Sequence, residues 1–302
     1  MQTTFDKKTK YKKEVEAYFK RNSLRSKIIA WVVSAVFMAY AISLIVPFLW
    51  LILNSFKTIG DFGNNPNGLP IPPYFGNFRE ALTHTAEPSG ANMIGMFINT
   101  LIIVCSSTLA TLITSSCAAY IVAKYKFRGR NIIFSAVIFA MIVPIIGALP
   151  AQLRLMHDLG LHDTYLGVIF IYSGGFGLNF LLLYSFFKNL SWSYAEAAYI
   201  DGASDFGIFI KIMIPLAAPA MMSVAVLTFI GLWNEFAVPQ IFLPSRPTLA
   251  VGLYELSGAL QTRHQWTMLF AAVVVVLIPI IVVFLIFQKT IMTNTVAGGL
   301  KG

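Results

Sequence analysis

The sequence predicts an all-α, polytopic membrane protein with six transmembrane helices. Hydrophobic residues make up 57% of the 302 residues and charged residues only 12%, whereas about 25% of a typical soluble domain is charged. The mean hydropathy of +0.72 agrees with this. Six apolar runs have about the ~20 residues that a helix needs to cross the hydrocarbon core. They lie at residues 28–53, 97–123, 131–153, 165–187, 216–243 and 267–288.

Lysine and arginine are unevenly distributed between the segments that connect these runs. Nine of the 22 lie in residues 1–27 and four in residues 124–130, and the same side also holds Lys188, Lys211, Lys289 and Lys301, which makes 17 against 5. The side richer in basic residues is usually cytoplasmic, so we expect both termini and residues 189–215 to be cytoplasmic. The net charge of +9 could instead indicate a nucleic-acid partner, but no basic surface interleaved with aromatic residues accompanies it. Contact with anionic membrane lipid is the better secondary role.

The chain begins with a basic N-terminal segment, residues 1–27, followed by the first transmembrane helix, residues 28–53. This apolar run is longer than that of a signal peptide, so we interpret it as an uncleaved anchor. Residues 54–96 are rich in turn-forming Pro, Gly and Asn and form an extracytoplasmic loop. Its apolar stretch, residues 69–78, could contact a partner, but packing on helix ends is favoured.

Residues 97–290 form the core transmembrane domain. Cys105 and Cys117 share one predicted helix, about 18 Å apart along its axis, and therefore cannot pair. Glycines and prolines in residues 144–150 and 173–177 either allow close backbone approach or break a helix, and the first use is commoner. No charged side chain lies at mid-depth there, so nothing resembles the ion relay of a secondary transporter. His and Asp residues in 154–163 resemble a metal cluster in spacing, but an exposed outer turn is the better interpretation, and we expect no metal site.

A polar island, residues 189–215, separates the fourth and fifth runs. Ser193 and Glu196 have the spacing of a capping box, which predicts a short helix that begins at Ser193. Gly202 is well placed for the left-handed residue that ends it. Alanines at 195, 197 and 198 would leave a low-relief surface on which another protein could pack. So small a surface helix needs a partner to be stable.

The spacing of residues across this island resembles the signature loop of the membrane subunits of binding-protein-dependent ATP-binding-cassette importers. Ile214 stands where that family usually has leucine. The resemblance implies a non-catalytic permease subunit whose cytoplasmic coupling helix transmits the movement of a partner ATPase. The residues that it assigns to ATPase coupling are Glu196, Ala197, Ala198, Asp201, Gly202, Ala203, Ile212 and Pro215.

The resemblance also implies the partners and the location. The implied partners are a second homologous permease, a cytoplasmic ATPase dimer and an extracytoplasmic sugar-binding protein. The implied location is a bacterial-type cytoplasmic membrane. This chain would bind no cofactor, because ATP and Mg belong to the ATPase. Residues 291–302 would form a short, flexible cytoplasmic tail that resembles the tail of the smaller membrane subunit of maltose-type importers, which enters the ATPase interface. The tail residues of that contact are Val296, Ala297, Gly298 and Gly299.

The segment Trp233 to Phe236 resembles one common in the sugar branch of the family, which implies an oligosaccharide-type substrate. Asn234 and Glu235 are therefore candidates to line the transport path. Glu235 is the only acid within a predicted span, about 18 residues into the fifth, so we expect it near the outer end of that helix. There it could reach water, bond to the outer loop or contact ligand. The structural contact is favoured.

The sequence gives no support for an enzyme. It contains no phosphate-binding loop, no dinucleotide-binding glycine motif, no His-Glu-x-x-His, and no nucleophile with an evident base. If ATP powers transport, hydrolysis must therefore take place on another polypeptide. The alternative from a different class is a self-sufficient secondary carrier or channel.

The charge asymmetry generates a test of orientation. In a background lacking Cys105 and Cys117, a cysteine that replaces Lys126 should be shielded from an impermeant thiol reagent in intact cells, and one that replaces Asn65 should be labelled. The opposite labelling pattern would contradict the orientation and the cytoplasmic position of residues 189–215.

Overall fold

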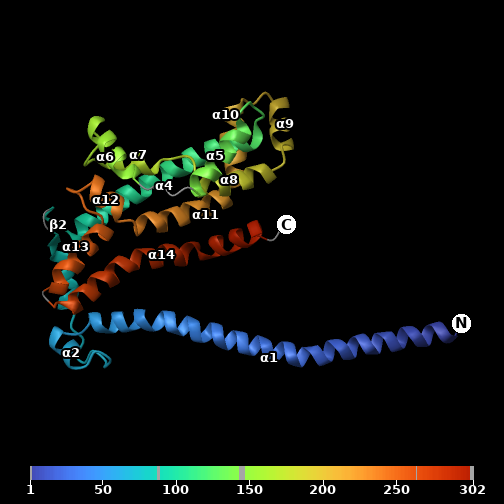
Figure 1. Cartoon of the computed structure of the whole chain (residues 1–302), viewed down its shortest axis with the longest axis horizontal. Helices are drawn as coiled ribbons and strands as arrows, with labels where there is room; N and C mark the ends of the chain where they lie inside the picture. The colour runs from blue at the N-terminus through green and yellow to red at the C-terminus, as the bar shows by residue number, and fades with distance from the viewer. Residues whose placement is uncertain (1, 87–88, 143–146, 263, 300–302) are drawn as a thin grey trace. The chain divides into compact units, whose positions relative to one another are not determined.

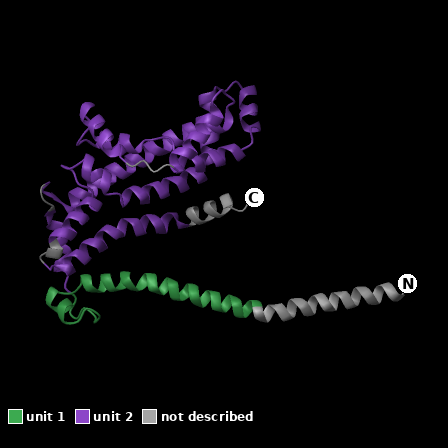
Figure 2. Ribbon diagram, in the orientation of Figure 1, with its two compact units in different colours: residues 1–73 green, residues 74–302 purple. Residues whose placement is uncertain are grey.

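The computed structural model describes residues 2–86, 89–142, 147–262 and 264–299, and these residues are mostly helical (Figure 1). The chain divides into two compact units, residues 1–73 and residues 74–302 (Figure 2). The all-α class is confirmed. In the described residues, strand structure is limited to the short antiparallel pair β1 (Thr85–Ala86) and β2 (Ala91–Asn92).

The first unit consists of α1 (Gln2–Ser55), α2 (Ile59–Asn64) and the loop that follows. Within α1, Ser26–Ser55 is long and apolar enough to cross a membrane. The polar loop folds back on the end of this helix. Nε1 of Trp50 donates to Oδ1 of Asn67 over 3.0 Å, and Nζ of Lys57 donates to the carbonyl oxygens of Asn65 and Pro66 over 2.9 and 3.1 Å.

The second unit is organised around α4 (Met93–Lys124), which packs against several of the other helices. Asn92 caps it, because its side chain accepts the N–H of Gly95 over 2.9 Å. Short α3 (Gly76–Thr83) precedes α4, and α14 (Trp266–Gly299) ends the unit. Together with Ser26–Ser55, the helices Met93–Lys124, Asp205–Trp233 and Trp266–Gln288 are the continuous described stretches whose length and apolar composition suit a membrane span.

The third and fourth apolar runs are present, and each of them contains two described helices. The third contains α5 (Arg130–Ile142) and α6 (Ala148–Asp158), and the fourth contains α7 (Tyr165–Tyr172) and α8 (Leu178–Asn189). The reason is visible between α7 and α8, where Gly177 has φ of +141°, a conformation that side chains disfavour. Thr111 of α4 satisfies part of the interrupted backbone by donating to the carbonyl oxygen of Tyr172 over 2.8 Å.

Close backbone approach occurs at the same interruption. A Cβ placed on Gly175 would lie 3.1 Å from the carbonyl oxygen of Thr114 in α4. The glycines of residues 173–177 therefore serve both uses that the sequence left open, since the helix breaks and the broken segment also packs directly on its neighbour.

The fifth span also differs from the predicted range 216–243. One helical path begins with α10 (Asp205–Ile208), passes through a π-helical turn, η1 (Phe209–Met213), and continues as α11 (Ile214–Trp233). The N–H of Ile214 bonds to the carbonyl of Phe209, five residues earlier. Pro215 follows directly and has no N–H to donate, which favours such a local change of pairing. The chain then turns into α12 (Ala237–Phe242) and α13 (Leu249–Thr262).

The buried side chains of the second unit form several clusters. One cluster joins α4, α8 and η1 through residues such as Tyr120, Phe187 and Met213. A second joins α3, α4, α13 and α14 around Trp233 and Leu249. A third joins α4, α6 and α12 around Ile103, Met156 and Phe242. In Figure 1, α9 and α10 lie at one end of this unit, whereas α13 and β2 lie at the other.

Candidate functional site

The predicted short helix is α9 (Ser193–Ile200), but its predicted capping box is wrong. The helix is preceded by Trp192, which makes no side-chain cap bond, so Ser193 is the first helical residue rather than the cap. Oγ of Ser191 takes the capping role instead, since it accepts the N–H of Ser193 over 3.2 Å. The carboxylate of Glu196 makes no hydrogen bond to any described residue, and its side chain is exposed.

The predicted end of α9 at Gly202 is confirmed. Gly202 has φ of +79°, and its N–H bonds to the carbonyl of Tyr199 over 3.0 Å. The N–H of Ala203 reaches the carbonyl of Ala198 over 2.9 Å. These two bonds form a Schellman motif, which satisfies the last carbonyls of a helix and requires a left-handed residue at its centre. No atom lies within 4 Å of a Cβ built on Gly202, so glycine is required there by conformation and not by space.

The alanines of α9 do not form a shared exposed surface, and this part of the prediction is wrong. Ala195 is fully buried and Ala198 is 7% exposed, because both pack into the cluster of α4, α8 and η1. Of the three, Ala197 is exposed. The small side chains of Ala195 and Ala198 therefore let α9 lie close on its own chain.

The exposed face of α9 and α10 is apolar at positions that the motif did not identify. Ile200 is 87% exposed, Phe206 is 74% exposed and Tyr194 is 50% exposed. Asp201 and Gly202 are also exposed, Ala203 and Ile212 are half-buried, and Pro215 is exposed. We call Tyr194, Ala197, Ile200 and Phe206 the α9 patch. Its apolar character could have been noted from the sequence, where Ile200 and Phe206 flank the mainly polar segment 201–205.

The C-terminal prediction can be followed only in part. The helix α14 continues through Gly299, so the backbone of Val296, Ala297, Gly298 and Gly299 is helical, where we expected a flexible tail. The side chains of these four residues and the whole of residues 300–302 lie outside what the structure describes.

At the other end of the unit, Glu235 does not lie within the fifth span, contrary to expectation. It lies in the turn between α11 and α12, where its Oε1 accepts the N–H groups of Ala237 and Val238 over 2.9 and 3.4 Å. This carboxylate therefore caps the start of α12. Nδ2 of Asn234 donates to the carbonyl of Ile230 over 2.8 Å, so both predicted path residues make local structural contacts.

The histidines and aspartates of residues 154–163 make local structural contacts. The rings of His157 and His162 stack with centroids 4.0 Å apart, and Oδ1 of Asp163 accepts the N–H of Ser245 over 3.1 Å. Within the described residues no three His, Cys, Asp or Glu side chains are grouped so that they could hold a metal ion.

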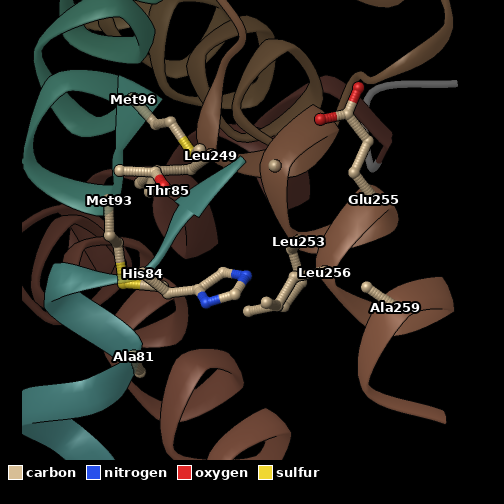
Figure 3. Close-up of a pocket in the computed structure, with 11 residues that line it drawn as sticks. Ala81, His84, Thr85, Met93, Met96, Leu249, Leu253, Glu255, Leu256 and Ala259 are labelled. Carbon is tan, nitrogen blue, oxygen red and sulfur yellow. The ribbon is translucent and has the colours of Figure 1, made fainter. Parts of the chain in front are cut away.

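A cavity of about 220 Å³ lies among α3, β1, α4 and α13. Figure 3 shows the ring of His84 directed toward Leu253 and Leu256, with Met93 and Met96 on the α4 side. Oε2 of Glu255, which also lines this cavity, is buried and has no hydrogen-bond partner among the described residues. Burial raises the pKa of the Glu255 carboxyl above its ordinary value of 4.5.

Comparisons with known proteins agree with one another. Residues 112–293 match the family described as binding-protein-dependent transport system inner membrane component. The chain is 32% identical over 261 residues to the diacetylchitobiose uptake system permease protein NgcG of Streptomyces coelicolor, covering 85% of this chain and 84% of that protein. It is 32% identical to the trehalose/maltose transport system permease protein MalG of Thermococcus litoralis, and the match covers 91% of this chain and 98% of that protein. It is 33% identical to the arabinooligosaccharides transport system permease protein AraQ of Bacillus subtilis, and the match covers 88% of this chain and 94% of that protein.

A solved structure is also similar. A chain in the crystal structure of a bacterial ABC transporter involved in the import of the acidic polysaccharide alginate matches with a TM-score of 0.73 and 26% identity. The match covers 88% of this chain and 97% of that one.

The cavity carboxylate generates a prediction about pH. Because burial disfavours the charged form of Glu255, its cost to folding is absent at low pH, where the group is protonated in both states, and grows as the pH rises above 4.5. Glu255→Gln should therefore raise the thermal unfolding midpoint in detergent at neutral pH and leave it unchanged near pH 4. The exposed Glu80→Gln is the matched control. Equal midpoints for Glu255→Gln and the unaltered protein at neutral pH would contradict the prediction.

Proposed function

The chain belongs to the family of inner membrane components of binding-protein-dependent transport systems, and from this premise we propose that it forms part of the path of an ATP-driven oligosaccharide importer. Relatives that match most of its length are named for the transport of diacetylchitobiose, trehalose or maltose, and arabinooligosaccharides. Because these are all short saccharides, we assign this chain to the same substrate class. As a permease subunit it is not itself an enzyme, and ATP with Mg would bind to the partner.

The observation that carries the proposal is the placement of α9. Its inner side is locked into the cluster of α4, α8 and η1 by Ala195 and Ala198, while its outer side presents the α9 patch. An apolar patch on a helix beyond the membrane spans is a suitable surface for a protein partner. A partner that moves α9 would also move the packed ends of α4 and α8.

The mechanism that fits this arrangement is alternating access. A cytoplasmic ATPase dimer would bind the α9 patch and the exposed Glu196. When the dimer closes on ATP, it would displace α9 and with it the packed spans, and the path would open toward the extracytoplasmic sugar-binding protein. Hydrolysis would return the spans to their first arrangement.

Two further parts of the proposal follow from the family resemblance and the charge distribution. A second, related permease would enclose the path with this chain, and Asn234 and Glu235 would lie near its outer opening. Both termini would be cytoplasmic, because 17 of the 22 basic residues fall on that side of the predicted spans. The tail residues 296–299 would contact the ATPase dimer.

A self-sufficient carrier is disfavoured by family membership, and purification distinguishes the two. A subunit should copurify with an ATPase and a second permease, and it should transport sugar only with ATP and the donor protein. Transport by this chain alone in proteoliposomes would overturn the proposal.

The turn at Gly202 provides a sharper test. A non-glycine residue in the left-handed region costs about 1–2 kcal/mol, which is roughly a 5–30-fold change in an equilibrium. Because the site is open, the strain is conformational, and it should disturb the docking surface without affecting membrane insertion. Gly202→Val should reach the membrane at normal levels and show greatly reduced uptake. Gly202→Asn should be milder, since asparagine tolerates this conformation.

Gly129→Val is the matched control, because Gly129 also has positive φ, at +91°, with open space around it, but lies outside α9 and its turn. Uptake is measured beside membrane abundance and ATPase copurification. Normal uptake in Gly202→Val would show that residues 189–215 are only a connector.

The α9 patch generates a separate prediction about ATPase affinity. A carboxylate introduced by Ile200→Glu or Phe206→Glu would have to be desolvated at the interface, so ATPase binding should weaken by about tenfold or more. Phe127→Glu is the control, since this exposed phenylalanine lies in the connection between α4 and α5. Unchanged ATPase binding in both patch variants would exclude the patch as the interface.

A further inference from the structure

The carboxylate of Asp205 joins three segments that are distant in the sequence. Asp205 is the first residue of α10. Its Oδ1 accepts the hydroxyl of Tyr125, which directly follows α4, over 2.8 Å. The same oxygen accepts the hydroxyl of Tyr199, in the last turn of α9. One acceptor atom therefore connects the end of α4, the end of α9 and the start of the helical path that leads into α11.

Aromatic contacts extend this connection to the start of α9. The ring of Tyr125 meets that of Trp192 edge to face, with centroids 6.0 Å apart. Trp192 immediately precedes α9, and its ring lies 6.3 Å from that of Tyr199. Tyr125 thus contacts α9 at its beginning directly and at its end through Asp205.

The same aromatic group reaches the buried core. Tyr125 meets Tyr120 edge to face at 5.7 Å, and Tyr120 stacks on Phe209 of η1 at 4.8 Å. Tyr120 is 3% exposed and Phe209 is 8% exposed. Tyr125 and Tyr120 therefore connect the residues around α9 to both α4 and the π-helical turn at the start of the fifth span.

The chemistry of these bonds suits a persistent connection. Hydrogen bonds to a carboxylate are shorter and stronger than those between neutral groups. The bond to Asp205 is the main cause that raises the pKa of the Tyr199 hydroxyl above its ordinary value, so this hydroxyl stays a donor at physiological pH. The connection also runs across the left-handed turn at Gly202, through which the chain passes between α9 and α10.

We propose that Asp205, Tyr125 and Tyr199 form a linkage that transmits the displacement of α9 to α4 and α11. Ala195 and Ala198 hold the middle of α9, and the linkage holds its two ends, so that without the linkage part of the movement is lost as tilting of α9. The three are positioning residues, and their role rests on the proposed function of α9 as the ATPase-docking helix.

The test uses the complete complex of permeases and ATPase in nanodiscs, with the donor protein added. Trehalose, maltose and diacetylchitobiose serve as probe sugars, because relatives are named for them. ATP hydrolysis is measured with and without liganded donor. In Tyr125→Phe/Tyr199→Phe, donor stimulation should fall at least about fivefold, while ATPase copurification and basal hydrolysis remain unchanged. Asp205→Asn keeps an acceptor oxygen but loses the charge, so its donor stimulation should lie between that of the double variant and that of the unaltered protein.

Tyr40→Phe is the matched control, since Tyr40 is an exposed tyrosine of α1 that lies outside both the linkage and the α9 patch. It should retain full stimulation. Full stimulation in the double variant would overturn the linkage alone. Loss of assembly or of basal hydrolysis in both the double variant and Asp205→Asn would also overturn it, because the residues would then serve folding. If the unaltered chain copurifies with no ATPase, that result contradicts the proposed function, and the linkage proposal, which rests on it, is contradicted as well.

Discussion

The structure depends first on the need to satisfy backbone hydrogen bonds away from water. Continuous helices meet this need within themselves, which explains why apolar runs such as Met93–Lys124 form single helices. Where a helix is broken, a neighbour must supply the missing partners. The hydroxyl of Thr111 does so for the carbonyl of Tyr172 at the end of α7, and the absence of a side chain on Gly175 lets the broken segment approach α4. The interruption is thus stabilised by α4, and α4 becomes the element on which the second unit is built.

The same helix connects the two ends of the unit. Near its start, Thr100 accepts the N–H of Leu249 in α13 over 2.8 Å, and near its end Tyr120 packs in the cluster that receives Ala195 and Ala198 of α9. A buried close-packed contact transmits displacement because it has little room to deform. Movement of α9 is therefore coupled to a helix whose other end packs beneath α13. For the proposed function, this contact path is the physical basis for relating an event at α9 to a movement at the other end of the unit.

The sequence predicted features that depend on local pattern and missed those that depend on distant partners. Apolar length located four spans, and the position of Gly202 predicted a left-handed helix end, which φ of +79° confirms. The capping box is absent because the hydroxyl of Ser191 accepts the N–H of Ser193. In a capping box, the carboxylate of Glu196 would have accepted that N–H. Glu235 was misplaced because hydropathy does not reveal that α11 ends at Trp233. The bond between Tyr125 and Asp205 spans 80 residues, and no short motif encodes such a pairing.

The loop around α9 combines a hydrogen-bonded glycine turn with packed contacts, and the combination has a mechanical consequence. The glycine turn alone would restrain only the last turn of α9, through the hydrogen bonds of the Gly202 and Ala203 N–H groups. Buried alanines alone would hold the middle of the helix but leave both ends free. Contacts at Trp192 and Tyr199 restrain the two ends, so the helix has at least three separate points of attachment to the rest of its unit. A helix held at its start, middle and end cannot tilt independently of the elements that hold it, so a tilt imposed on α9 is passed on to the helices packed against it.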